Sequence, residues 1–212
     1  SAIPVDPDDW NHFFAFMKNG GSTAVYETTD GGQSWTRVQG ATHKEFKRGY
    51  GFKDKAGNLK FIGANQGGSN YLDSKVWYSD NKGVTWKQVV LPDSLKEIHP
   101  ATGARGSFFQ NFAFDPENRD KIYITTSRSI YYSEDGLTPQ VGANGATTFN
   151  IKRLTFDVYN QDGTVLRASN VNEFPFKATT QSFLEINPNN PKQMWFATAS
   201  RNVSYGVYSA VY

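Results

Sequence analysis

The stretch Thr28-Thr-Asp30-Gly-Gly32-Gln-Ser34-Trp35 decides the fold, because it recurs along the chain. A second copy runs from Ser79 to Trp86 with Asn in place of Asp, and a third, Ser133 to Thr138, keeps the opening but lacks the Trp. The pattern predicts a corner between two antiparallel strands, where Asp or Asn caps the backbone, Gly takes positive φ and a buried Trp anchors the turn. The residues assigned to this corner are Thr28, Asp30, Gly32, Trp35, Ser79, Asn81, Gly83, Trp86, Ser133 and Asp135.

A second repeat runs in phase with the first. An acidic or amide residue follows two alternating apolar residues, and another apolar residue comes eight positions later. Such a pattern predicts two strands joined by a short loop, and a third strand then leads into the repeated corner and a fourth strand. Units of four strands and about 40–50 residues are typical of β-propeller blades. The residues that mark this second repeat are Asp6, Asp54, Asp115, Asp157 and Asn187.

The spacing of the units predicts an all-β propeller of four to five blades, or part of a larger one with about six to eight. The fourth unit is contracted, because Asp157 and Asn187 are only 30 residues apart. An insert from Leu91 to Gly106 lengthens the second unit, and Pro92 to Glu97 could form one helical turn. A further chain could complete the ring. The predicted blades are 1–44, 45–107, 108–150, 151–180 and 181–212.

Composition excludes several classes of function. The 212 residues carry a net charge of +2 with both signs interspersed, which gives no basic stripe for nucleic acid. No segment approaches the roughly 20 apolar residues of a membrane helix. Cysteine is absent, and the three histidines are far apart in sequence, so no metal site and no cofactor are expected. The 32 aromatic residues, 19 Gly and a mean hydropathy of −0.59 suit a rigid β-protein with a polar surface.

The repeated corner resembles the Asp-box, or BNR, repeat of the sialidase and xyloglucanase-like propellers. The stretch from Phe112 to Tyr123, with its Asp-Pro after an apolar strand, is closest in style to the xyloglucanase-like glycoside hydrolases. The resemblance covers nearly the whole chain as fold and implies an exported protein, at the cell surface, in the periplasm or outside the cell. The Phe/Tyr-Arg-Ile-Pro segment of sialidases is absent, and the two catalytic aspartates of the xyloglucanase-like family match no motif here.

Four residues outside the repeats are candidates for a site. Asp8 and Asp9 are weak candidates for catalytic carboxyl groups, since glycoside hydrolysis needs two acids across a cleft. Trp10 and Tyr71 lie in loops rich in Gly, Asn and Asp, and flat aromatic rings stack on sugars. We expect these four residues on one loop face. Packing of Trp10 over a blade edge is the simpler structural alternative.

Two main functions remain open from the sequence. One is hydrolysis of O-glycosidic bonds in a polysaccharide such as xyloglucan. The other is non-catalytic binding of a glycan, and a propeller that binds a protein ranks below both. A fold of this kind hosts many functions, so the residues of the site must decide between them.

Overall fold

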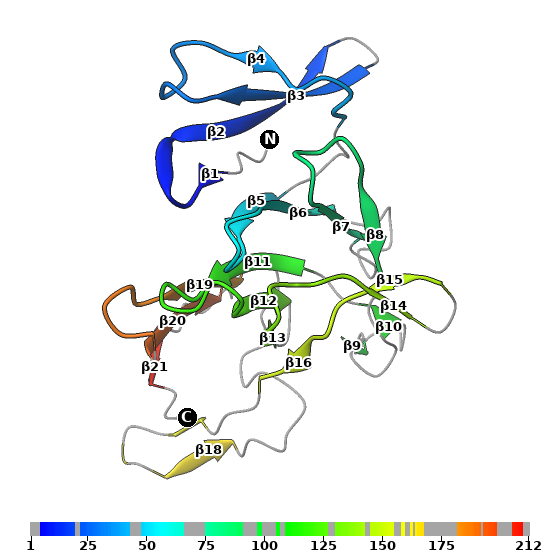
Figure 1. The fold of residues 1–212 in the computed structure, drawn as a ribbon. Helices are drawn as coiled ribbons and strands as arrows, with labels where there is room; N and C mark the ends of the chain where they lie inside the picture. Colours follow the sequence, from blue (N-terminus) through cyan, green and yellow to red (C-terminus); the bar gives the residue numbers. More distant parts are fainter. Residues whose placement is uncertain are drawn as a thin grey trace.

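The computed structural model is built from β-strands, and no helix occurs among the residues it describes (Figure 1). One pairing, β15 with β8, is parallel, and the other described pairings are antiparallel. The predicted all-β class is therefore correct. The described residues are 5–19, 22–42, 48–65, 75–90, 97–98, 105–106, 109–126, 130–142, 145–154, 158–159, 162, 164–167, 182–191, 193–198 and 205–209.

Four sheets form the main units of the fold. The first unit contains β1 (Val5–Asp6), β2 (Asp9–Asn19), β3 (Ser22–Thr28) and β4 (Thr36–Arg37). The second unit contains β5 (Arg48–Lys53), β6 (Leu59–Asn65), β7 (Lys75–Ser79) and β8 (Lys87–Val89). The third unit contains β11 (Phe109–Phe114), β12 (Ile122–Thr126), β13 (Ile130–Ser133) and β16 (Lys152–Arg153). The last unit contains β19 (Ser182–Ile186), β20 (Gln193–Thr198) and β21 (Tyr205–Ser209).

Shorter strands extend or accompany these sheets. The pair β14 (Gln140–Val141) and β15 (Thr147–Thr148) joins the outer edge of the second unit through β8. Two separate hairpins are β9 (Glu97–Ile98) with β10 (Arg105–Gly106), and β17 (Val158–Tyr159) with β18 (Val165–Arg167). The predicted helical turn, Pro92 to Glu97, falls on residues 92–96, outside the described part of the chain, and on Glu97, which begins β9.

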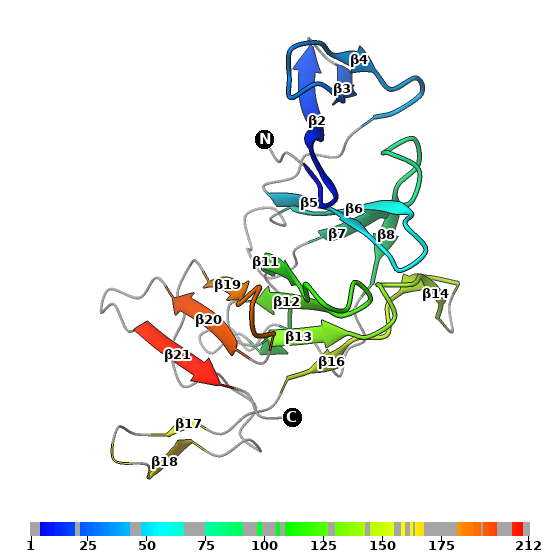
Figure 2. The same ribbon diagram turned by 60° about the vertical axis from the view of Figure 1, so that its left-hand side comes forward.

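The units are arranged as consecutive propeller blades. Their first strands lie next to one another in the order β1, β5, β11, β19, so the sheets fan out from a shared inner edge (Figures 1 and 2). Within each unit the strands follow chain order from the inner edge outward. This radial series of antiparallel sheets is the architecture that the repeats predict.

The third unit extends beyond the boundary predicted at residue 150, because β16 pairs with β13. Both β11 and β12 contact β19, so the last unit follows the third directly in space. The described residues of the predicted blade 151–180 contribute β16 and the hairpin β17–β18, which projects away from the main sheets (Figure 2). The residue that marks its repeat, Asp157, lies outside the described residues.

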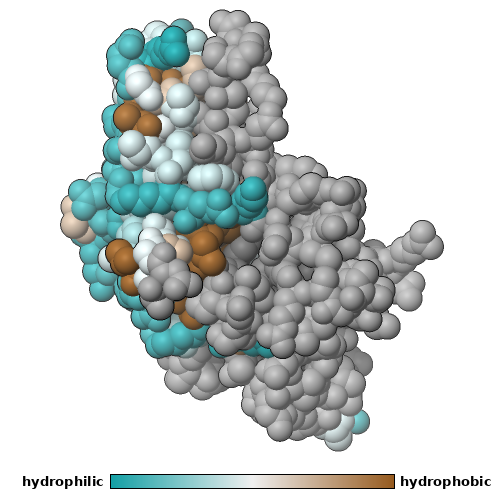
Figure 3. Space-filling model, turned by 90° about the vertical axis from the view of Figure 1, so that its right-hand side faces the viewer, coloured by the Kyte–Doolittle hydropathy of each residue, from teal (hydrophilic) through white to brown (hydrophobic). Residues whose placement is uncertain are grey.

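The hydrophobic core lies between neighbouring units. Phe14, Phe16 and Val25 of the first unit pack with Phe61 of the second. A larger cluster joins the second and third units, and a third cluster joins the third unit to Leu184, Ile186 and Met194 of the last. Burial between sheets leaves the described surface mostly hydrophilic on the side shown in Figure 3, with apolar groups scattered over it.

The three copies of the repeated corner share a set of hydrogen bonds. The hydroxyl of Thr28, Ser79 or Ser133 donates to the Oδ1 atom two residues later, at 2.8, 3.0 and 2.6 Å. The same hydroxyl accepts the N–H four residues later, from Gly32 and Gly83 at 2.9 Å and from Leu137 at 3.4 Å. The Oδ1 of Asp30 and of Asn81 also accepts the N–H of Ser34 and of Thr85, both at 2.9 Å. Capping of the corner by its own side chains follows from the sequence pattern.

The two tryptophans of the corner differ in burial. Trp86 is half-buried, packs near Phe16 and Phe61, and donates its Nε1–H to the Thr42 carbonyl at 2.6 Å. Trp35 is 41% exposed, so the prediction that it is buried is wrong. The reason is that a neighbouring unit supplies the burial: Trp86 packs on the first unit, while Trp35 lies on the face of the first unit that is turned away from the second.

Candidate functional site

The loop between β1 and β2 presents the candidate acids and Trp10 at one end of the first unit. Asp6 ends β1, and its Oδ1 accepts the N–H of Asp8 at 3.0 Å, which closes the turn. Asp9 begins β2 and accepts the N–H of Asn11 at 2.9 Å. Trp10 follows with its side chain 82% exposed, so it does not cover a blade edge. The hydrogen bonds that Asp6 and Asp9 accept from nearby backbone N–H groups therefore hold the loop that presents the exposed Trp10 indole.

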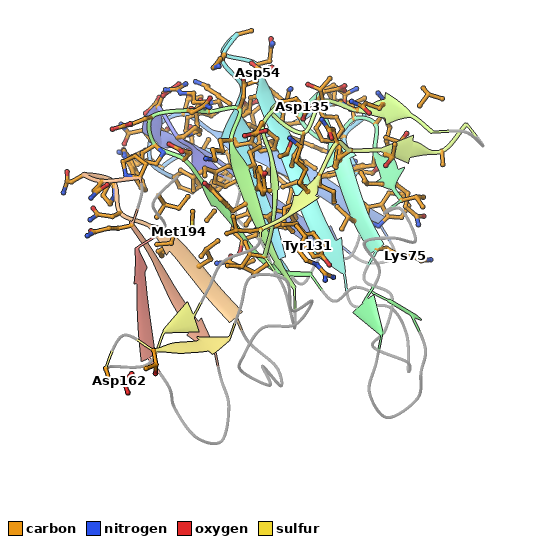
Figure 4. All side chains as sticks on the ribbon, turned by 90° about the horizontal axis from the view of Figure 1, so that it is seen from below. Asp54, Lys75, Tyr131, Asp135, Asp162 and Met194 are labelled. Carbon is orange, nitrogen blue, oxygen red and sulfur yellow. The ribbon has the colours of Figure 1, made fainter. Side chains whose placement is uncertain are left out.

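The sheet end that carries Trp10 also carries the β5–β6 loop of the second unit and the repeated corner of the third unit. Asp54, which caps the loop between β5 and β6, lies at this end together with Asp135 of the third corner, whereas Lys75 lies toward the opposite end (Figure 4). Tyr71 lies outside the described residues, in segment 66–74 between β6 and β7.

A chain of ionisable side chains runs beneath the loop. We call it the charge network, and it consists of Lys82, Glu27, His12, Asp6, Lys53, Asp8 and Arg119. Its first half lies between the first and second units. Lys82 Nζ is 2.6 Å from Glu27 Oε1, and His12 Nε2 is 2.7 Å from the same oxygen. The other ring nitrogen of His12, Nδ1, lies 2.9 Å from Asp6 Oδ2.

The second half of the charge network reaches the third unit. Lys53 Nζ lies 2.8 Å from Asp6 Oδ1 and 3.3 Å from Asp8 Oδ2. Arg119 binds Asp8 with its two terminal guanidinium nitrogens, and its Nη1 donates to Asp8 Oδ2 at 2.8 Å. Bidentate pairing of this kind fixes geometry as well as charge. The charge network thus ties three units together at the end that carries Trp10.

The carboxyl groups of the charge network are held in the ionised form. Hydrogen bonding from Arg119 lowers the pKa of Asp8 below its usual value. Burial opposes ionisation of Asp6 and of Glu27, but hydrogen bonds from Lys53 and from Lys82, with those from His12, outweigh it, so both pKa values are lowered. A general acid in glycoside hydrolysis needs a raised pKa. These three groups are therefore unsuited to donate a proton near neutral pH.

Sequence reasoning selected Asp8 but missed its partners. Lys53 follows an alternating strand pattern, and Arg119 is 111 residues from Asp8, so no local spacing connects them. The repeat itself was the available signal, because Asp6 and Lys53 end the first strands of adjacent units. Adjacent first strands bring those two ends together.

The arrangement suits binding of a ligand with hydroxyl groups. Alternation along β2 puts Trp10 on the same face as His12. The exposed indole offers a flat apolar surface, and the adjacent exposed Asp9 offers a carboxylate that accepts hydroxyl hydrogens. Within the described part of the chain, no three His, Asp or Glu side chains gather as a metal site. The same residues include no helix that could span a membrane.

Comparisons with known proteins give structural likenesses alone. No protein-family model and no curated protein matches the chain. It is similar to the GH74 enzyme of Niastella koreensis, with 19% identity, 93% of this chain and 33% of that chain covered, and a TM-score of 0.43. It is also similar to the GH74 xyloglucanase of Xanthomonas campestris, with 17% identity, 99% of this chain and 36% of that chain covered, and a TM-score of 0.44. A third similar structure is YCF48 bound to D1 peptide, with 13% identity, 99% of this chain and 63% of that chain covered, and a TM-score of 0.38. The chain spans about a third of the length of the two GH74 proteins, and likenesses this distant carry no conclusion about activity.

Proposed function

We propose that this chain is an Asp-box-type propeller module of an exported carbohydrate-active protein, and that it binds a polysaccharide through Trp10. The observation that carries the proposal is that Trp10 is 82% exposed at the sheet end where the charge network lies. An exposed Trp held by a rigid strand is suited to stacking on a sugar ring. The resemblance of the corners to the Asp-box repeat supports the carbohydrate class and a place outside the cytoplasm.

Binding is favoured over hydrolysis at this end of the sheets because Asp8, one of the two candidate acids, is already paired. Asp8 is engaged by Arg119 and Lys53, and its pKa is lowered. Hydrolysis of O-glycosidic bonds needs two facing carboxyl groups about 5 Å or about 6.5–9.5 Å apart, one of them protonated. It remains the second candidate, supported by the xyloglucanase-like style of the stretch from Phe112 to Tyr123. Its acids would then lie elsewhere in the protein.

Binding and hydrolysis assays on a panel of plant and host glycans, xyloglucan first, test the proposal. We expect a glycan to bind without release of reducing ends. Trp10→Ala should weaken binding by about 1–3 kcal/mol, the scale of one buried aromatic side chain. Val141→Ala is the matched control, because Val141 is also exposed, at 83%, but lies on β14. Unchanged affinity of Trp10→Ala for a verified glycan would contradict the proposal, and release of reducing ends would favour hydrolysis.

A further inference from the structure

The contact between the first and second units shows how one unit covers the next. Trp86 packs near Phe16, and its Nε1–H donates to the Thr42 carbonyl after the fourth strand of the first unit. Phe61 is buried beside it against Phe14. The apolar pair of Phe61 and Trp86 is therefore the part of the second unit that the first unit covers.

The first unit carries the same pair at equivalent positions. Phe13 pairs across the sheet with Thr28, just as Phe61 pairs with Ser79, and Thr28 and Ser79 both begin the repeated corner. Phe13 contacts Trp35 edge to face, with ring centroids 5.4 Å apart. The register of β2 and β3 thus makes Phe13 and Trp35 the counterparts of Phe61 and Trp86.

This pair is uncovered on the first unit. Trp35 is 41% exposed and Phe13 is half-buried, whereas Phe61 is 1% exposed. Met17 lies on the same face of β2 as Phe13 and is 47% exposed. The indole N–H of Trp35 donates to Gly32 within its own corner, at 3.1 Å, instead of to another unit. An exposed apolar face of this composition is typical of an interaction site.

We infer that the face formed by Phe13, Met17 and Trp35 docks a further four-stranded propeller unit. That unit supplies an aromatic side chain in the place of Phe16 and a backbone carbonyl in the place of Thr42, to which the Trp35 indole N–H transfers its hydrogen bond. This face repeats, on the first unit, the face of the second unit that the first unit already covers. It does not depend on the proposed function.

A second copy of this chain fits the face less well. The surface with the required groups, around Phe16, Val25 and Thr42, is already covered by the second unit. Among the described residues, the last unit contributes β19, β20 and β21. Within each copy, the groups of the first unit that would cover Trp35 are thus already in contact with the second unit.

The test adds a second copy of residues 1–44 before Ser1, with Trp35→Phe in the added copy. In ¹⁵N-indole-labelled protein, we expect the Nε1–H signal of the original Trp35 to shift and to exchange with solvent at least tenfold more slowly than in the unextended chain. The Trp10 signal should stay unchanged, because alternation along β2 puts Trp10 on the opposite face from Phe13. Equal exchange of Trp35 in both proteins would overturn the inference.

Stability and oligomeric state give two further tests of the same face. Trp35→Ala should lower the midpoint of thermal unfolding more in the extended protein than in the unextended one, and an equal loss in both would overturn the inference. In sedimentation, we expect the unextended chain to be monomeric. A dimer that Trp35→Ala dissociates would show that a second copy is the occupant and would also overturn the inference.

Discussion

Leu137 stands at the same position of the repeated corner as Gly83, and both backbones are left-handed, with φ of 51° and 85°. A Cβ atom on Gly83 would lie 3.2 Å from the Trp86 ring and 3.2 Å from Val25. The third copy has the exposed Gln140 where the second has Trp86. Without the indole, a side chain fits at the glycine position, and Leu137 is fully buried in the core between the second and third units. The corner that loses its Trp thus fills the space with a leucine.

Leu137→Ala and Leu137→Gly test this exchange. Both should destabilise the protein by about 2–5 kcal/mol, because a buried leucine is lost. A protein with alanine at a given position is usually more stable than one with glycine, but a left-handed backbone disfavours any Cβ atom by about 1 kcal/mol. We therefore expect Leu137→Gly to be the more stable of the two in urea denaturation. If Leu137→Ala is the more stable, the backbone is not held in the left-handed conformation.

The two corner tryptophans should differ in their effect on stability. Trp86→Ala removes a half-buried indole and its hydrogen bond to Thr42, and should destabilise by about 3 kcal/mol. Trp35→Ala removes a side chain that is 41% exposed, and should destabilise by about 1 kcal/mol. Chemical denaturation of both variants measures the difference. Equal losses would mean that Trp35 is covered in solution.

The charge network should contribute to stability at Lys53 more than a surface ion pair does. Lys53→Met leaves buried Asp6 without its ammonium partner, so we expect a loss of about 1.5–3 kcal/mol, the range for hydrogen bonds to charged groups. Lys55→Met is the matched control, because Lys55 is 67% exposed and pairs with Asp120 at 3.3 Å. A surface pair of that kind contributes about 0–1 kcal/mol. Similar losses in both variants would argue against the charge network.

Asp30 makes the first corner sensitive to acid. Hydrogen bonds from the Ser34 hydroxyl and backbone, and from Thr28, lower the pKa of Asp30 from 3.8 to about 2. A lowered pKa in the folded state adds stability above the unfolded value of 3.8, and that stability is lost as the pH falls to about 2.

Asp30→Asn should remove this acid dependence while keeping the corner, since Asn81 performs the same capping in the second copy. The free energy of unfolding, measured between pH 5 and pH 2, should fall less steeply in the variant than in the unaltered chain. Parallel curves would show that Asp30 titrates normally.

The fold was predictable from the sequence because its corners are built from local contacts. Asp30 and Asn81 cap residues four positions away, and Asp6, Asp54, Asp115 and Asn187 each accept a backbone N–H within four residues. Such short-range hydrogen bonds leave a readable spacing. Burial of Trp35 was not predictable, because it depends on a neighbouring unit.

The candidate site was only partly predictable for the same reason. Trp10 was identified as an aromatic residue outside the repeat, and it is exposed. The pairing of Asp8 with Arg119 joins residues 111 positions apart and changes the chemistry of the acid. The parallel pairing of β15 with β8 likewise depends on how the third unit connects to the edge of the second.

Titration of ¹⁵N-indole-labelled protein with xyloglucan oligosaccharides tests the central claim most directly. Each of the five tryptophans gives one Nε1–H signal, and Trp10→Phe assigns the signal of Trp10. We predict that the Trp10 signal moves in a saturable manner, while the signals of Trp35 and Trp86 stay in place. Saturable binding of a glycan that leaves the Trp10 signal unmoved would contradict the account.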